Sequence, residues 1–226
     1  HQHAKSDHPT LSKTQALSNG TDSITYEAQV TDAQGNAINA ARVAWSADNP
    51  DATLSASDTS SGMNGKTTIT VTSLKAGKVV VTAQTSEATP LQAEPATFIA
   101  DSATATIKTL KSDRTSALAN GSDAISLTAT VEDANGNQLN NVDVNWTVDP
   151  ATGTLSASSS KTDASGVARV TLSSRDVAQY SATASSGSSS ESLSGLSFIV
   201  DSSTAHLDTL TASSTQVLAD NKAAIT

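Results

Sequence analysis

The chain contains no cysteine, so no disulfide bond can stabilise it. Secreted domains often carry disulfides, and the absence has two explanations: export through a membrane in an unfolded state, where early cross-links would block passage, or a cytosolic protein. Histidine is limited to His1, His3, His8 and His206. Nucleophilic catalysis needs a base beside the nucleophile, so this distribution argues against an enzyme. The pair at positions 1 and 3 is interpreted as a tag or linker remnant.

Basic residues are also scarce, with 13 Lys and Arg against 22 Asp and Glu and a net charge of −9. Nucleic-acid-binding domains present basic surfaces, so we expect no nucleic acid partner. No apolar run approaches the ~20 residues that a membrane-spanning helix needs. There is no glycine-rich phosphate loop and no zinc-ligand spacing. We therefore predict that the chain holds no cofactor and no metal.

What the sequence does contain is a repeat of about one hundred residues. Trp45 recurs as Trp146, an offset of 101, and the pattern Asp-Ala-x-Gly-Asn occurs at 32–36 and again at 133–137. A repeat of this length matches an independently folding domain and exceeds the 20 to 50 residues of solenoid units. The sequence therefore predicts a tandem array of one domain.

The repeat also sets the predicted boundaries. Residues 1–9 are expected to be a tag, a linker or a partial first strand, followed by one domain over 10–101 and a second over 102–201. Residues 202–226 match the start of a third copy and are too few to bury a core of their own. We expect the chain to be a segment of a longer protein.

Apolar residues alternate with polar ones within each copy, as in Ile24, Tyr26, Ala28 and Val30. This period of two is typical of half-buried strands, and turn signals such as Asn-Gly and Ala-Gly recur about every ten residues. An all-β chain of tandem immunoglobulin-like β-sandwiches is the predicted fold. The alternation places Trp45 and Trp146 inward, and the predicted structural core consists of these two residues with Phe98 and Phe198.

The first strands of the two copies differ. Copy two has Ile107 and Leu110 where copy one has Ser6 and Pro9, so copy one is expected to lack part of its first strand. Residues 206–210 read as a first strand with no domain behind it. One hypothesis is that this strand adds to the open edge of copy one in a neighbouring molecule.

Asp101 and Asp201 close the two copies and mark the predicted domain junctions. Carboxylates at junctions can hold Ca²⁺, which prefers six to eight oxygen ligands, but no Asp-x-Asp cluster surrounds either position. Local roles in turns and caps are therefore the favoured interpretation.

Several motifs recur in order in both copies: Asn-Gly, Asp-Ala-x-Gly-Asn, Val-x-Trp and a closing Phe-Ile-x-Asp. Together they resemble the bacterial Ig-like domains of the intimin and invasin adhesins, also called inverse autotransporters. The resemblance covers about residues 10–201 fully and 202–226 in part. It implies an exported passenger segment at the bacterial cell surface, anchored at the outer membrane by a part of the protein outside this sequence.

The resemblance further implies a stalk that spaces and presents a distal tip for cell adhesion or biofilm formation, with a host cell-surface or matrix protein or glycan as the partner. Two alternatives stay open. The Ig-like domains themselves could bind the host protein or glycan, which an apolar patch on one copy alone would favour. The chain could also be an accessory module of a secreted carbohydrate-active enzyme.

Overall fold

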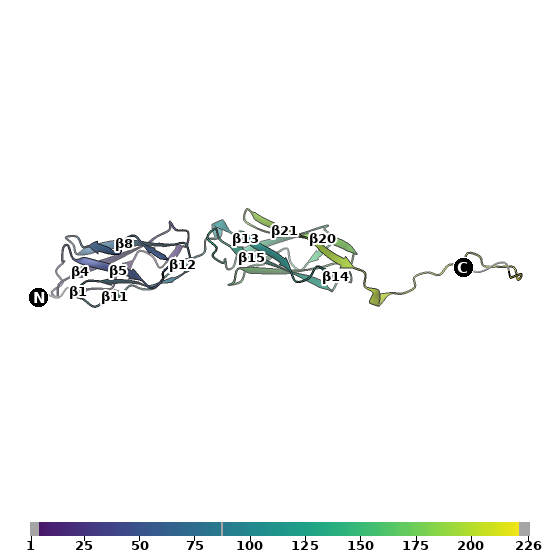
Figure 1. Cartoon of the computed structure of the whole chain (residues 1–226), viewed down its shortest axis with the longest axis horizontal. Coiled ribbons are helices and arrows are strands. Elements are labelled where there is room, and N and C mark those ends of the chain that lie inside the picture. The colour runs from purple at the N-terminus through teal and green to yellow at the C-terminus, as the bar shows by residue number, and fades with distance from the viewer. Residues whose placement is uncertain (1–4, 87, 222–226) are drawn as a thin grey trace.

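A computed structural model describes residues 5–86 and 88–221, and it contains two β-sandwiches that follow one another along the long axis of the molecule (Figure 1). The fold class predicted from the sequence, tandem Ig-like sandwiches, is confirmed. Within the described residues, no helix is long and apolar enough to cross a membrane.

The first repeat is built from short strands. One sheet has the order β1/β2-β4-β8-β6, the other has the order β11-β10-β5-β7, and β3-β12-β9 form a smaller sheet. The bounds are β1 (Lys5–Ser6), β2 (Thr10–Leu11), β3 (Gln15–Leu17), β4 (Ile24–Thr31), β5 (Arg42–Ala47), β6 (Ala52–Leu54), β7 (Asp58–Ser60), β8 (Lys66–Ser73), β9 (Gly77–Val79), β10 (Val81–Gln84), β11 (Leu91–Gln92) and β12 (Ala96–Ile99).

The second repeat has the same plan with longer strands. Its sheets have the orders β13-β15-β19-β17 and β14-β21-β20-β16-β18. A short 3-10 helix precedes it and another follows it. The bounds are η1 (Ser102–Thr104), β13 (Thr106–Ser112), β14 (Ser116–Leu118), β15 (Ala124–Glu132), β16 (Asp143–Asp149), β17 (Thr154–Leu155), β18 (Ser159–Lys161), β19 (Val167–Ser173), β20 (Ala178–Ser186), β21 (Ser189–Ile199) and η2 (Ser202–Thr204).

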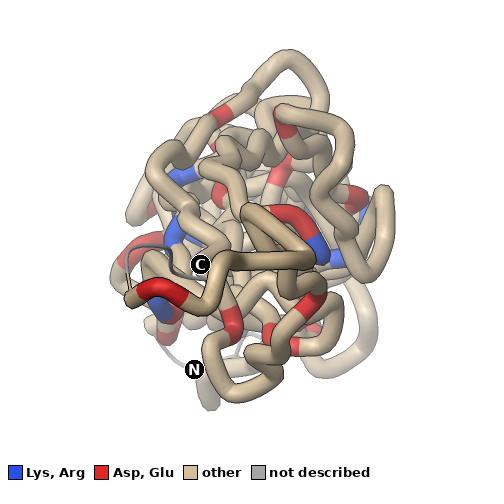
Figure 2. Tube along the Cα trace, turned by 90° about the vertical axis from the view of Figure 1, so that its right-hand side faces the viewer, with Lys and Arg blue, Asp and Glu red and all other residues tan. Residues whose placement is uncertain are grey.

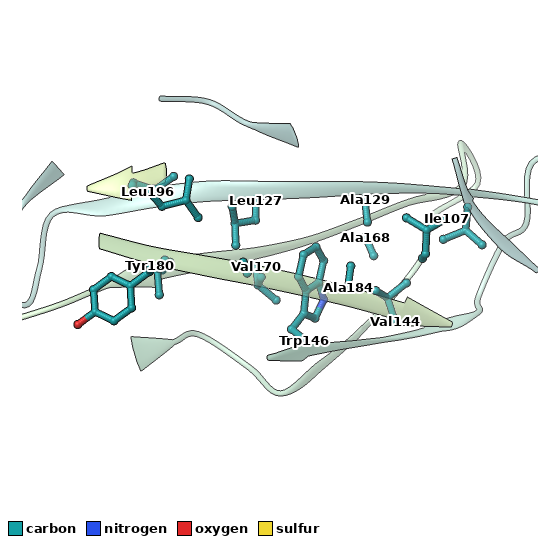
Figure 3. Close-up of a cluster of buried hydrophobic side chains, with 14 of the residues drawn as sticks. Ile107, Leu127, Ala129, Val144, Trp146, Ala168, Val170, Tyr180, Ala184 and Leu196 are labelled. Atoms are coloured by element: carbon teal, nitrogen blue, oxygen red, sulfur yellow. The ribbon is translucent and has the colours of Figure 1, made fainter. Parts of the chain in front are cut away.

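The predicted alternation is present in the strands. In β4 the side chains of Ile24, Tyr26, Ala28 and Val30 are buried, and the residues between them are exposed or half-buried. Each repeat has its own core between its two sheets, and Figure 3 shows the core of the second repeat around Trp146. The four aromatic residues predicted to lie in the core are at most 4% exposed: Trp45, Trp146, Phe98 and Phe198.

Both tryptophans also make a polar contact. Trp45 Nε1 donates to Thr59 Oγ1 at 2.8 Å, and Trp146 Nε1 donates to Ser160 Oγ at 2.9 Å. In each repeat the hydroxyl comes from the strand that pairs with the tryptophan strand, β7 or β18. The indole therefore fills the core with its rings while its one donor is satisfied, as buried polar groups require.

Each core contains one buried tyrosine, but at a different position of the repeat. By the offset of 101, Tyr26 of repeat one is replaced by Leu127 in repeat two, and Val79 of repeat one is replaced by Tyr180. Tyr180 packs edge-on against Phe198 with ring centroids 5.7 Å apart. Its hydroxyl is within 2.9 Å of Thr152 Oγ1 and 2.8 Å of Ser174 Oγ, whereas the buried Tyr26 hydroxyl has no hydrogen-bond partner among the described residues.

The first strand of repeat one is present but interrupted. Lys5–Ser6 and Thr10–Leu11 both pair with β4, at the positions that the continuous β13 occupies beside β15. Pro9 lies between the two pieces and has no N–H to give to a ladder. The edge of β4 is thus already paired with β1 and β2. The hypothesis that residues 206–210 of a neighbouring molecule pair with this edge therefore lacks an open strand to accept them. Residues 205–221 form no strand in the structure.

Candidate functional site: the junction between the repeats

The clearest polar site in the molecule lies where the two repeats meet. It is made by the turn 133–137 of repeat two, which follows β15 and contacts the end of repeat one. Asp133 organises the turn from its first position. Its Oδ1 accepts from the main-chain N–H groups of Asn135 and Asn137, both at 2.9 Å, as Asp side chains do in tight turns.

Asn137 ends this turn and reaches across the junction. Its Oδ1 accepts from Ala76 N at 2.8 Å, and its Nδ2 lies 2.8 Å from Leu74 O and 3.1 Å from Ser18 Oγ. The Asn137 side chain is only 6% exposed and Ser18 is fully buried. The donor and the acceptor of this buried carboxamide are both hydrogen-bonded. A shift of the side chain would leave a buried polar group without a partner, so its position is closely fixed.

Three further hydrogen bonds tie the turn to repeat one and to the linker. Asp133 Oδ2 accepts from Asp101 N at 3.0 Å, and Asn135 Nδ2 donates to Ser18 O at 3.4 Å. Thr104 Oγ1, in the linker helix η1, accepts from Ala134 N at 2.9 Å. The turn therefore contacts repeat one at three separate places in the sequence, near residues 18, 75 and 101.

The pKa of Asp133 lies below its ordinary value of 3.8. Burial acts against ionisation, but the N–H groups of Asp101, Asn137 and Asn135 and the carboxamide of Asn137 outweigh it. Hydrogen bonds to the ionised carboxylate stabilise it, so Asp133 is held in its charged form.

Asp101 and Asp201, the predicted junction residues, occupy equivalent positions. Asp101 caps η1 by accepting from Ala103 N, and Asp201 caps η2 by accepting from Ser203 N. Asp101 also touches a turn of the following repeat, through its main-chain N–H. Among the described residues no group of three or more His, Asp or Glu side chains is arranged to hold a metal ion.

The matching turn of repeat one, 32–36, makes no such contacts with the residues that the structure describes. Asp32 accepts from Gln34 N and from Asn36 N, both at 2.9 Å, so the turn is folded in the same way. Asn36 donates to Asp32 Oδ2 within its own turn, as Asn137 does to Asp133 Oδ2, but Asn36 is exposed. The two turns share the pattern Asp-Ala-x-Gly-Asn, with Gln34 in one and Asn135 in the other, and only the turn of repeat two has another repeat against it among the described residues.

The arrangement of the two sandwiches agrees with the comparison to known families. The model of the bacterial Ig-like domain (group 1) family matches residues 8–99 and 107–199. The chain belongs to this family.

The relatives of this bacterial Ig-like array include an adhesin. The inverse autotransporter adhesin YeeJ of Escherichia coli strain K12 is 39% identical over 99 residues, which are 44% of this chain and 4% of that protein. The D0–D1 domain of intimin is 35% identical and covers 86% of this chain and 99% of that chain, with a TM-score of 0.41. InvD of Yersinia pseudotuberculosis has the same fold, with a TM-score of 0.62 and 13% identity over 92% of this chain and 62% of that chain.

The chain thus consists of bacterial Ig-like domains of this family, similar to part of the inverse autotransporter adhesin YeeJ, and it spans only a small part of that curated relative. Sequence reasoning identified the Asp-Ala-x-Gly-Asn pattern of these domains as a turn but missed its contact with the preceding domain. The recurrence of Asn36 and Asn137 did not reveal this contact, because each of them also bonds the first Asp of its own turn.

Proposed function

We propose that the chain is part of the extracellular stalk of a bacterial adhesin anchored at the outer membrane. In this role it spaces and presents a distal tip for adhesion to host cells or for biofilm formation. The observation that carries the proposal is the buried set of hydrogen bonds that Asn137 makes with repeat one. A stalk works only if its domains resist bending against one another, and this contact opposes bending.

The hydrogen bonds at the junction set the rough free-energy cost of bending one repeat against the other. A typical intramolecular hydrogen bond contributes about 0.5–1.5 kcal/mol net. Six contacts link the turn 133–137 to repeat one and the linker, and the two made by Asn137 Nδ2 share its two hydrogens with Asp133 Oδ2. Bending that broke all of them would cost several kcal/mol, which is enough to keep bent states rare. Each repeat adds on the order of 30–40 Å, since the longest strands have 8 residues in repeat one and 11 in repeat two, at ~3.3 Å per residue.

The surface is suited to an extended array. Figure 2, a view along the long axis, shows acidic positions spread around the trace with fewer basic positions between them. A net charge of −9 makes neighbouring copies repel one another and keeps the chain soluble. The receptor-binding tip and the membrane anchor of the whole adhesin belong, in this proposal, to parts outside the present sequence, and the tip would bind a host cell-surface or matrix protein or glycan.

Spin-label distance measurements test the stalk directly. Met63→Cys and Ala164→Cys place labels at equivalent exposed turns of the two repeats, and the chain has no other cysteine to label. We expect one narrow distance distribution. The comparison is the same labelled pair with a flexible Gly-Ser spacer inserted after Asp101, which should give a broad one. Equal widths for the two proteins would overturn the stalk proposal.

A second function, ligand binding by repeat one itself, is favoured by one observation. Repeat one carries a hollow of about 710 Å³ lined by Pro9, Leu11, Ala93 and Glu94 among others. Beads coated with the chain, compared with beads that carry an unrelated Ig-like array, separate the two functions. Saturable binding to epithelial cells or matrix proteins would support ligand binding, and binding equal to the control would support the stalk alone.

A further inference from the structure

The turn 133–137 binds the end of repeat one mainly through main-chain atoms. Four of its contacts are with atoms that any residue at the same position would offer: Ser18 O, Leu74 O, Ala76 N and Asp101 N. The Ser18 hydroxyl adds one side-chain contact. Recognition of this end therefore depends on how the backbone is folded there more than on which side chains it carries.

The end of repeat two offers the same set of main-chain atoms. By the repeat offset of 101, or 100 for the last of them, the equivalents are Ala119 O, Arg175 O, Val177 N and Asp201 N. Among residues 5–86 and 88–221, these four atoms have no hydrogen-bond partner. Ala119 is only half-buried, whereas Ser18 is fully buried in the formed junction. The two ends thus carry the same donors and acceptors, and one of them has a domain against it.

The loops that carry these atoms are folded alike in the two repeats. In the loop after β8, Ser73 Oγ accepts from Lys75 N at 3.0 Å. In the loop after β19, Ser174 Oγ accepts from Asp176 N at 2.9 Å. Because the same local bond shapes both loops, each presents its outward main-chain groups in the same way.

The linker that leaves repeat two also repeats the linker that leaves repeat one. Asp101 caps η1 with φ −90° and ψ 100°, and Asp201 caps η2 with φ −89° and ψ 92°. Ala105 and Ala205, which end the two helices, have φ −53° and −59°. Beyond η2 the chain runs on along the long axis of the molecule (Figure 1). The local path of the linker is therefore the one that places repeat two against repeat one.

Apolar side chains are exposed at the end of repeat two. Ala100, which follows the last strand of repeat one, is half-buried and packs against the core of repeat two. Its equivalent Val200 is 67% exposed, and Val177 in the loop after β19 is 63% exposed. Exposed apolar groups at a surface that is covered in the other repeat indicate a site for another domain.

The residues after η2 indicate which kind of domain this is. Leu207 and Leu210 are 92% and 94% exposed. Their equivalents Ile107 and Leu110 lie in the first strand of repeat two and pack against its core. The two leucines therefore match the inward face of the first strand of an Ig-like sandwich.

We propose that the end of repeat two binds the turn Asp-x-x-Gly-Asn of a further Ig-like domain, joined to it through residues 202–226. The carboxamide of the turn asparagine bonds to Arg175 O and Val177 N, as that of Asn137 bonds to repeat one. This asparagine is then the residue that decides whether a junction in the array is fixed or hinged. The proposal rests on the stalk function above and adds the partner domain and the residue that recognises the backbone.

Amide hydrogen exchange followed by NMR tests the contact. A three-domain chain is made by adding a copy of residues 127–201 directly after Thr226, because the repeat aligns 225–226 with 125–126. The added segment completes an Ig-like domain and supplies its turn. We expect the Val177 N–H to exchange at least about tenfold more slowly in the longer chain than in the parent, since it gains a partner there.

Matched variants assign the slowing to the turn. Asn137→Ala in the added copy alone should return the exchange of the Val177 N–H to the parent rate. The same change in the original repeat two alone should leave the exchange slow. Spin labels at Ala164→Cys and at the same position of the added copy should give a narrow distance distribution, which broadens in the first variant and not in the second.

The folding of the added domain is checked by circular dichroism. If it does not fold, a complete copy of residues 102–201 placed directly after Asp201 takes its place, because this copy contains every strand of repeat two. The same exchange and distance measurements then apply to that chain.

Three results would overturn the proposal. The first is unchanged exchange of the Val177 N–H in a folded three-domain chain. The second is equal slowing with and without the asparagine of the added turn. The third is slowing in the parent chain that grows with protein concentration and disappears in Asn36→Ala, because the partner would then be a second copy of the chain.

The stalk proposal is tested separately, at the first junction. A narrow distribution between the labels at Met63→Cys and Ala164→Cys, together with rapid exchange of the Val177 N–H in the three-domain chain, would refute this inference and leave the stalk proposal standing.

Discussion

The carboxamide nitrogen of Asn137 lies 3.1 Å from the hydroxyl oxygen of Ser18, a residue 119 positions earlier in the chain. Both side chains are buried, so the contact joins the two sandwiches inside the junction and not at its rim. Repeat domains of this kind have few other means of controlling their mutual orientation, because most of each core contacts only itself. The junction therefore gives the sharpest predictions for the array.

Replacing Asn137 by alanine should loosen the junction without unfolding either repeat. The change removes the acceptor of Ala76 N and the donor to Leu74 O, leaving buried main-chain groups unpaired at about 1–3 kcal/mol. The spin-label distance distribution should broaden. Asn36→Ala is the matched control, since the same residue in the free turn contacts no other repeat, and its distribution should equal that of the parent. Broadening by both variants to the same extent would contradict the role of the junction.

The junction should weaken in acid. The pKa of Asp133 is depressed in the folded chain, so the stabilisation from its charged form is present above the ordinary value of 3.8 and is lost as pH falls through the lower folded pKa. We expect constant spin-label distances from pH 7 down to about 5 and a broader distribution below about 4. Asp133→Asn should show the broad distribution at neutral pH, because an amide cannot accept all of the same bonds. If the width of the spin-label distance distribution does not change before the chain unfolds in acid, the carboxylate does not have this role.

The two core tyrosines should respond in opposite directions to loss of the hydroxyl. Tyr180→Phe breaks the hydrogen bonds with Thr152 and Ser174 and should destabilise repeat two by about 1–2 kcal/mol. Tyr26→Phe removes a buried hydroxyl without a partner and should leave repeat one unchanged or more stable. Urea unfolding of the two variants measures both effects. A large loss in Tyr26→Phe would show that its hydroxyl is satisfied in solution.

The same tyrosine predicts a dependence on alkaline pH. Burial, with a smaller effect of the Asp48 charge, raises the pKa of Tyr26 to about 12. The stabilisation is complete below the unfolded value of 10 and is lost as pH rises toward 12. Repeat one should therefore lose stability between these values, and Tyr26→Phe should lose less of it. Equal losses in parent and variant would assign the effect to other groups.

Gly65 should be the least replaceable glycine of repeat one. It has φ +76°, and a Cβ there would lie 2.5 Å from Val30 O, a main-chain atom that cannot move aside. Gly35 has φ +87°, and a Cβ added there would have no other atom within 4 Å. Gly35→Ala should cost about 1–2 kcal/mol through its left-handed backbone, and Gly65→Ala should cost clearly more. Thermal unfolding ranks the two variants, and equal melting temperatures would contradict the prediction.

The sequence by itself determined the array, its strands and its cores. Alternation of apolar residues is a local property, so β4 and its equivalent β15 could be placed from the sequence with their inward faces assigned. The recurrence of Trp45 as Trp146 fixed the repeat, and a repeat of domain length implies two separate sandwiches.

Only the tertiary structure decided what the recurring residues do. Asn36 and Asn137 stand in the same local sequence, and they differ because one meets Ser18 and Leu74 of another repeat while the other faces solvent. Likewise Pro9 and Ala93 are distant in sequence and create a hollow only because two sheet edges bring them together. Contacts between remote segments depend on how whole sandwiches pack, and no local pattern in the chain records that packing.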